Sequence, residues 1–317
     1  MRQARRGSGA LALSVAGLAT AAALLSARRR TPAPRQMRRA ERTLVSVKDQ
    51  RARAARGFSR SSSLLALSVL ADSSVEHYRG SFANPAMFVP LVSATLSLFA
   101  GVHSRRDQRA ASHTLRHGIY AFAAFAGLAG TGFHLYNVTK RVGGWSWNNL
   151  FYAAPLGAPM ALMLSGGLGA MGERLRNAPV EQRFVLGMPV GRTLSLAVSA
   201  GLLGTVAEAG LLHFRGAFQH PAMFAPLVIP PMSAALLAHA ALSRPQPRPW
   251  TRGWLRLTTW LGLLGVGFHA RGIARCHGGW RNWSQNLLSG PPLPAPPSFT
   301  ALAIAGLAAL RLREIER

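Results

Sequence analysis

The sequence predicts an all-α integral membrane protein, with an N-terminal anchor helix followed by two tandem four-helix transmembrane units. Hydrophobic residues make up 49% of the 317 residues, whereas only 15% are charged, and the charges occur in clusters. The stretch EHYRGSFANPAMFVPL at residues 76–91 returns as LHFRGAFQHPAMFAPL at residues 212–227. Self-similarity at one offset indicates an internal duplication.

The apolar stretches predict about nine membrane spans. A helix needs about 20 mostly apolar residues to cross a ~30 Å hydrocarbon layer, so the last stretch is short and we expect it to be tilted or to reach only part way. No polar surface helices lie between the stretches, which argues against a soluble bundle. The predicted spans are residues 9–27, 61–75, 86–103, 118–138, 150–171, 193–212, 222–242, 255–273 and 299–312.

The basic residues predict the orientation of these spans. The net charge is +27, and 27 of the 37 Lys and Arg residues lie in alternate connecting segments or at the C-terminus, at residues 28–60, 105–116, 174–192, 244–256 and 311–317. The positive-inside rule places these segments and the C-terminus in the cytoplasm. We therefore expect a bacterial inner (plasma) membrane protein whose basic segments meet anionic lipid rather than nucleic acid.

The domain organisation follows from the spans and the repeat. The first 27 residues have the basic start and apolar middle of a signal peptide. Cleavage would leave a strongly basic segment outside, so we interpret this span as an uncleaved anchor. The predicted parts are an anchor and basic cytoplasmic linker (1–60), membrane unit 1 (61–177), a linker (178–190) and membrane unit 2 (191–317).

The two units match at polar positions at an offset of 135 to 137 residues. Asp72 matches Glu208, and a His-aromatic-Arg-Gly motif begins at His77 and at His213. A GLxGxGFH motif ends at His134 and at His269. An even number of spans in each unit predicts parallel repeats, related by an axis along the membrane normal. The matched motifs then lie at the non-cytoplasmic ends of the helices.

The four matched histidines are the candidate site. Ionisable side chains at membrane depth usually face the bundle interior and mark function. Two histidines on two helices of one unit suffice to ligate a b-type haem. Gly130 and Gly265, four residues before their histidines, would give clearance to a flat macrocycle, and arginines could pair with its propionates. The predicted haem contacts are His77, His134, His213, His269, Arg79, Arg215, Gly130 and Gly265.

Other interpretations of these motifs stay open. Small residues at this spacing also serve close helix packing in membranes. With Asp72 and Glu208 the histidines resemble two sets of ligands for a non-haem metal, although five residues of helix turn the carboxylate away from the histidine. Proton relay, or a hydrogen bond to another helix, suits these carboxylates better. Trp145 and Trp280 in the Gly-Gly-Trp loops are expected at the headgroup level, as interfacial residues, a lid or a docking surface.

The remaining histidines and the single cysteine carry less weight. Cys276 is the only cysteine, and the Cys-x-x-Cys-His pattern of covalent haem attachment is absent, which excludes that class. His103, His113 and His117 fall among arginines and are expected to be solvated.

Three functions remain compatible with the sequence. The first is a membrane subunit for electron transfer, through haem b or quinone, that serves or anchors an extracytoplasmic dehydrogenase. No dinucleotide-binding fingerprint occurs, so the catalytic step would belong to another chain. The second is a small-solute or proton-coupled transporter, and the third a non-catalytic anchor or assembly protein.

Overall fold

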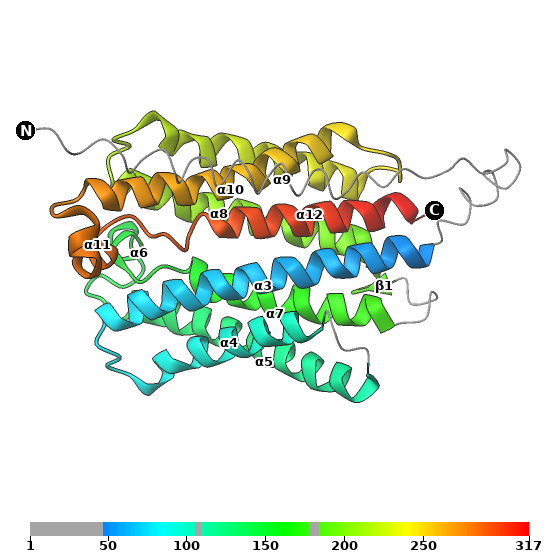
Figure 1. Cartoon of the computed structure of the whole chain (residues 1–317), viewed down its shortest axis with the longest axis horizontal. Helices are drawn as coiled ribbons and strands as arrows, with labels where there is room; N and C mark the ends of the chain where they lie inside the picture. Colours follow the sequence, from blue (N-terminus) through cyan, green and yellow to red (C-terminus); the bar gives the residue numbers. More distant parts are fainter. Residues whose placement is uncertain (1–46, 105–108, 178–183, 317) are drawn as a thin grey trace, which may run out of the picture. The chain divides into compact units, whose positions relative to one another are not determined.

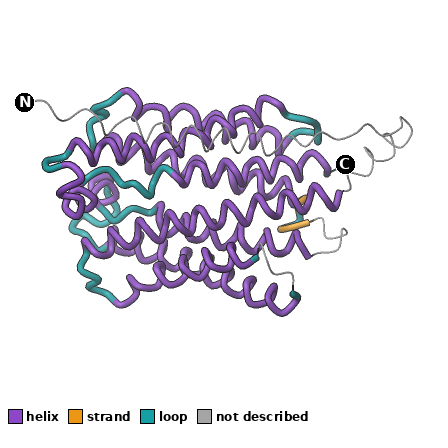
Figure 2. Tube along the Cα trace, in the orientation of Figure 1, coloured by secondary structure: helices purple, strands orange, loops and turns teal. Residues whose placement is uncertain are grey.

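The protein is almost entirely helical (Figures 1 and 2). A computed structural model describes residues 47–104, 109–177 and 184–316. The first half comprises α3 (Val47–Arg79), the 3₁₀ helix η1 (Pro85–Phe88), α4 (Val89–His103), α5 (Ala110–Thr139), α6 (Trp147–Tyr152) and α7 (Gly157–Asn177). A two-stranded antiparallel hairpin, β1 (Phe184–Val185) and β2 (Met188–Pro189), leads to the second half. That half comprises α8 (Val190–Arg215), η2 (Pro221–Phe224), α9 (Ala225–Leu242), α10 (Pro249–Arg275), η3 (Gly279–Asn282), α11 (Trp283–Ser289) and α12 (Pro297–Ile315).

Four of the helices are long and apolar enough to cross a membrane: Pro85–His103, Ala111–Thr139, Val190–Arg215 and Pro221–Leu242. Their outer faces carry large exposed apolar side chains, among them Phe99, Phe125 and Met232. An apolar surface of this extent marks a membrane interaction rather than a water-facing surface. The chain therefore has the features of an all-α integral membrane protein. The expected span at residues 9–27 lies outside the described residues.

The core of the bundle forms between helices of the two halves. Figure 1 shows α3, α7, α8 and α12 as long neighbouring helices, and α3 packs against both α7 and α12. Helix α12, expected to be short, runs from Pro297 to Ile315, and most of its residues are buried. Its small residues permit this burial, because Ala301, Ala305 and Ala308 let neighbouring backbones approach closely.

Two boundaries differ from those expected. Helix α3 begins at Val47 rather than near residue 61, because Ala54, Ala55 and Phe58 pack in the main core and extend the helix into the basic segment. The expected continuous span 150–171 is divided into α6 and α7. Pro155 interrupts it, since proline lacks an N–H and disfavours helical geometry in the preceding residue.

The matching loops of the two halves lie at one end of the bundle. In Figure 1, α6 and α11 lie together at the end opposite the C-terminus. Four long helices also have their C-terminal ends here: α3, α5, α8 and α10. Each is followed in the chain by a short helix of the connecting loop, namely η1, α6, η2 and η3. We call it the loop end, and the end that holds the C-terminus the basic end.

Candidate functional site

All four matched histidines make the same kind of hydrogen bond at the loop end. The Nδ1 atom of each ring lies 2.6 to 2.7 Å from a backbone carbonyl oxygen: His77 with Met87, His134 with Pro155, His213 with Met223 and His269 with Pro292. A carbonyl oxygen only accepts, so Nδ1 must carry the proton. In the neutral ring, Nε2 is then the unprotonated nitrogen, and within the described residues it makes no hydrogen bond of its own. This is the ring state required of a metal ligand.

The histidines lie in two pairs, one in each half. His77 on α3 interacts electrostatically with His134 on α5, and His213 on α8 interacts in the same way with His269 on α10. Each pair therefore brings together two imidazoles from different helices. Within the described residues no group of three or more His, Cys, Asp or Glu side chains is arranged to hold a metal ion. The two imidazoles of each pair are the candidate donors.

The loop after α3 positions His77 and is repeated after α8. Ser81 and Phe82 adopt positive φ angles of 55° and 46°, as do Ala217 and Phe218. Phe82 stacks on Phe88 at 4.5 Å, and its backbone N–H donates to the His77 carbonyl. Consecutive non-glycine residues at positive φ cost energy and persist only where surrounding contacts hold them. The turn brings the carbonyl oxygen of Met87 within hydrogen-bond distance of His77 Nδ1.

The prolines of the Pro-Ala-Met-Phe motif lie where the sequence predicts them. Pro85 and Pro221 each occupy the first turn of a 3₁₀ helix that continues into α4 or α9. Their missing N–H is harmless there, because the first turn of a helix has no partner for it. The motif thus has a structural explanation, and its methionine supplies the carbonyl that binds the histidine.

The glycines beside His134 and His269 pack against neighbouring helices. A Cβ at Gly130 would lie 3.2 Å from the Pro159 side chain, and one at Gly265 would lie 2.8 Å from Pro296. One turn earlier, Gly127 and Gly262 approach the backbones of α7 and α12. These contacts favour the helix-packing interpretation of the four glycines over clearance for a ligand.

The two matched arginines have different surroundings. Arg79 forms an exposed ion pair with Glu76 at 2.7 Å. The guanidinium of Arg215 instead lies over the rings of Phe151 and Tyr152, at 5.5 and 5.9 Å from their centroids. Both side chains are at the loop end, and a common role for them stays a prediction.

Glu208 joins the two halves of the molecule. Its carboxylate accepts a hydrogen bond from the backbone N–H of Gly157 at the start of α7, and it fills the space that a Cβ at Gly157 would take. A carboxylate is favourable at a helix N-terminus, where N–H groups lack partners. Asp72, on α3, interacts electrostatically with Glu208. The hydrogen bond to another helix, one of the two roles considered for these carboxylates, is therefore present at Glu208.

The Gly-Gly-Trp loops turn sharply and expose their tryptophans. Both glycines of each loop have positive φ, between 52° and 90°. The Asn149 side chain donates to the carbonyls of Val142 and Gly144, and Asn286 holds the second loop in a comparable way. Trp145 and Trp280 are 64% and 50% exposed, which agrees with an interfacial position.

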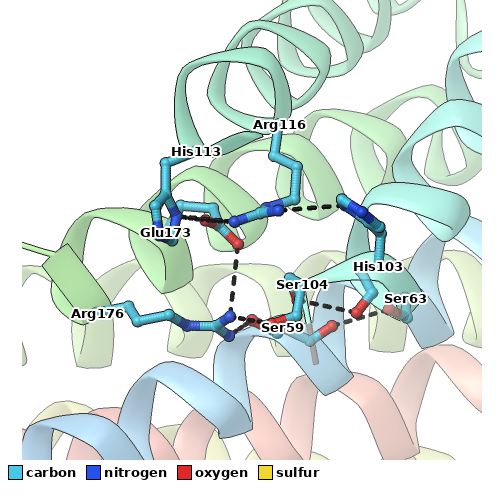
Figure 3. A network of polar contacts seen from close by, with 9 residues as sticks. Ser59, Ser63, His103, Ser104, His113, Arg116, Glu173 and Arg176 are labelled. Atoms are coloured by element: carbon cyan, nitrogen blue, oxygen red, sulfur yellow. Dashed lines mark hydrogen bonds and ion pairs between the residues drawn. The ribbon is translucent and has the colours of Figure 1, made fainter. Parts of the chain in front are cut away.

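The basic end contains a buried polar network that the sequence analysis missed (Figure 3). His113 Nδ1 lies 2.5 Å from a Glu173 carboxylate oxygen, and Arg116 lies 3.2 Å from the same atom. Arg116 and Glu173 are both 2% exposed, and His113 is 12% exposed. The prediction of a solvated His113 is therefore wrong. No clear sequence signal marks this network, because Glu173 lies outside the predicted span 150–171 and beside Arg174 and Arg176, where a charged residue is expected at a helix end.

The network links three helices at this end. Arg116 also contacts His103 at the end of α4, at 3.2 Å. Arg176 donates to the carbonyl of Ser104 and lies 4.0 Å from Glu173. Since these residues come from α4, α5 and α7, the network ties the basic end of the first half together.

Comparison of the chain with protein-family models, with curated proteins and with solved structures found no match.

Proposed function

We propose that the chain is a membrane electron-transfer subunit in which each histidine pair ligates one b-type haem at the non-cytoplasmic face. The observation that carries the proposal is the uniform state of the four imidazoles. Each donates Nδ1–H to a backbone carbonyl and keeps Nε2 as an acceptor. A hydrogen bond at the second ring nitrogen is the usual support of a metal-ligating histidine, since it orients the ring and strengthens it as a ligand.

We propose further that the chain consists of two tandem four-helix units with a parallel arrangement and about nine spans. Matched contacts support the duplication. The carbonyl partners of His77 and His213 are the methionines of the two Pro-Ala-Met-Phe motifs. Gly130 meets Pro159 as Gly265 meets Pro296, and Arg176 binds the carbonyl after α4 as Arg313 binds the one after α9. Under this proposal the loop end is non-cytoplasmic and the C-terminus is cytoplasmic.

The residues of the chain act by holding and tuning the site. A haem b would supply reversible one-electron transfer at its iron. Two imidazoles on facing helices of a four-helix bundle are a suitable ligand pair for it. The carbonyls of Met87 and Pro155 fix the two ring planes in the first half, and those of Met223 and Pro292 do so in the second. With two histidines holding the iron of each haem, the site would carry electrons rather than bind substrate.

The exposed loops suit a partner at the same face. Trp145 and Trp280 would lie at the headgroup level, beside the histidine pairs. We propose that an extracytoplasmic dehydrogenase docks on this face and exchanges electrons with the haems, directly or through quinone in the bilayer of a bacterial plasma membrane.

An optical reduced-minus-oxidised spectrum of the full-length protein, expressed with haem and iron supplied, tests the proposal. We expect a reversible b-type signal that falls by about half in His134→Ala and in His269→Ala and disappears in the double variant. His239→Ala is the matched control, because His239 is exposed at the basic end, where its ring hydrogen-bonds to Ser243, and its loss should leave the signal intact. Folded protein without a chromophore would overturn the proposal.

A second candidate function is a proton-coupled transporter. The observation that favours it is the interaction between Asp72 and Glu208, two carboxyl groups from different halves of the molecule. Carboxyl groups at membrane depth mark proton paths in transporters. Proton uptake into liposomes that contain the protein, lost in Asp72→Asn but kept in the histidine variants, would support this function over electron transfer.

A further inference from the structure

A cavity with a strongly positive wall lies at the basic end, between α3 and α12. Its volume is about 500 Å³. Arg53, Arg56 and Arg60 contribute from one face of α3, where spacings of three and four residues bring side chains together, and Arg311 contributes from α12. Among the described residues, Asp49 is the one acidic side chain that lines it.

Most of this charge is not neutralised within the described residues. Asp49 forms its ion pair with Arg53, at 2.8 Å. Arg56, Arg60 and Arg311 have no ion-pair partner in the described part of the chain. Arg53 and Arg56 also act on Arg311 as repelling like charges. Glu314 attracts Arg311, but it already pairs with Arg252, so the arginines that line the cavity outnumber the carboxylates near them and the arrangement favours an added anion.

The floor of the cavity is apolar. Ile304 and Leu307 line it beside the arginines, and both are partly exposed. Gly57 closes it where α3 crosses α12, since a Cβ at Gly57 would lie 2.8 Å from the Ala308 side chain. The cavity therefore has cationic groups at one side and an apolar surface that can contact an acyl chain at the other.

We infer that this cavity binds the phosphate group of an anionic phospholipid of the cytoplasmic leaflet. Arg56, Arg60 and Arg311 would hold the phosphate oxygens, because the guanidinium group matches phosphate geometry with paired hydrogen bonds. One acyl chain would lie against Ile304 and Leu307. Basic pockets between helices at the cytoplasmic side are the expected form of a headgroup site. The inference does not depend on haem binding, so either proposal can fail without the other.

The choice of lipid over a free phosphate anion follows from the apolar floor. A soluble anion would use the arginines alone, whereas a phospholipid also covers Ile304 and Leu307. The site lies at the end where most of the Lys and Arg residues fall, which is the end that the positive-inside rule places in the cytoplasm. The anionic lipids of that leaflet are the phosphate groups nearest to it.

The test measures binding of phosphatidylglycerol to the full-length protein in phosphatidylcholine nanodiscs, by native mass spectrometry with increasing phosphatidylglycerol. We expect saturable retention of phosphatidylglycerol, with the Kd raised at least about tenfold in the variant Arg56→Gln/Arg60→Gln/Arg311→Gln. Arg56→Gln alone should give a smaller loss and serves as the readout if the triple variant does not fold. Arg174→Gln is the matched control, because Arg174 stands 137 residues before Arg311 in the repeat and is exposed outside the cavity.

A separate arm distinguishes the two sources of phosphate. Inorganic phosphate is titrated into the same protein in phosphatidylcholine alone and followed by calorimetry. Equal retention of phosphatidylglycerol by wild type and triple variant would overturn the inference. So would phosphate binding that the triple variant loses while phosphatidylglycerol shows no specific retention, since the site would then serve a soluble anion.

Discussion

The two halves of the molecule share the histidine contacts at the loop end and differ in one buried ion pair at the basic end. In residues 47–177 and again in residues 184–316, two histidines donate to carbonyls in matching loops. At the basic end, the first half buries Glu173 with Arg116. The positions that match them in the repeat are Leu310 and Thr251, which are 0% and 3% exposed. One half therefore packs apolar and small polar side chains where the other pairs charges.

This difference separates two kinds of polar residue. At the positions of Glu173 and Arg116 the second half has no charged side chain, so this buried ion pair is not shared by the two halves. The histidine contacts occur in both halves, although apolar residues at these positions would cost less free energy to bury in a membrane. We propose from this comparison that the charged network has a structural role and that the histidines have a chemical one.

The largest expected effect is at the basic end of the first half. Glu173→Leu leaves the buried Arg116 without its carboxylate, and we expect a loss of about 3–5 kcal/mol in the free energy of unfolding. The double variant Glu173→Leu/Arg116→Thr copies the second half and should recover most of this loss. Denaturant unfolding in detergent measures both. Additive losses in the double variant would show that the network cannot be replaced by packing.

Helix packing at the matched glycines should give the next largest effect. Gly127→Ala places a Cβ 2.6 Å from the Pro159 carbonyl oxygen, so the helices must separate, at a cost of about 1–3 kcal/mol. Gly132→Ala is the matched control on the same helix, because its Cβ would meet no atom within 4 Å. Thermal unfolding compares the two variants. A similar shift in both would contradict the assigned packing role.

The histidine variants should affect stability only modestly. His134→Ala removes one hydrogen bond in a membrane protein, so we expect a loss of about 1 kcal/mol in the apo protein. The same variant should abolish the redox signal of its half. Unfolding of haem-free protein, beside the optical spectrum, measures both quantities. A loss as large as that of Glu173→Leu would instead assign His134 a structural role.

The smallest effect is expected at Arg79. Its exposed ion pair with Glu76 contributes little, and Arg79→Ala should change the free energy of unfolding by less than about 1 kcal/mol. If Arg79 binds a haem propionate, the variant should still shift the midpoint potential of the first half, which a redox titration detects. An unchanged potential would remove Arg79 from the haem contacts.

Much of the helical framework could be predicted from the sequence. The lengths of the apolar stretches predicted helices after residue 61, and the repeated motif selected the four histidines. Both signals could be read because they lie within short stretches of sequence. The extension of α3 to Val47 was missed because it depends on the burial of Ala54 and Phe58 against distant helices. The break before α7 was missed because the predicted span 150–171 is mostly apolar along its 22 residues, and hydropathy does not register the helix-breaking effect of Pro155.

The contacts of the site were less predictable than its residues. The sequence selected His77 and His134 but could not show that backbone carbonyls 10 and 21 residues later fix their tautomers. It assigned clearance to Gly130, whose real neighbour is Pro159 on α7. It placed His113 among solvated residues, because its partner Glu173 is 60 residues away in the chain.

The most direct test of the central claim is the haem content of the purified full-length protein, measured as haem b per polypeptide after reconstitution. We expect two haems per chain in wild type, one in His134→Ala, one in His269→Ala and none in the double variant. A wild-type protein that is folded and binds no haem would contradict the claim, as would a single haem lost equally in both single variants, since the two pairs would then not be separate sites.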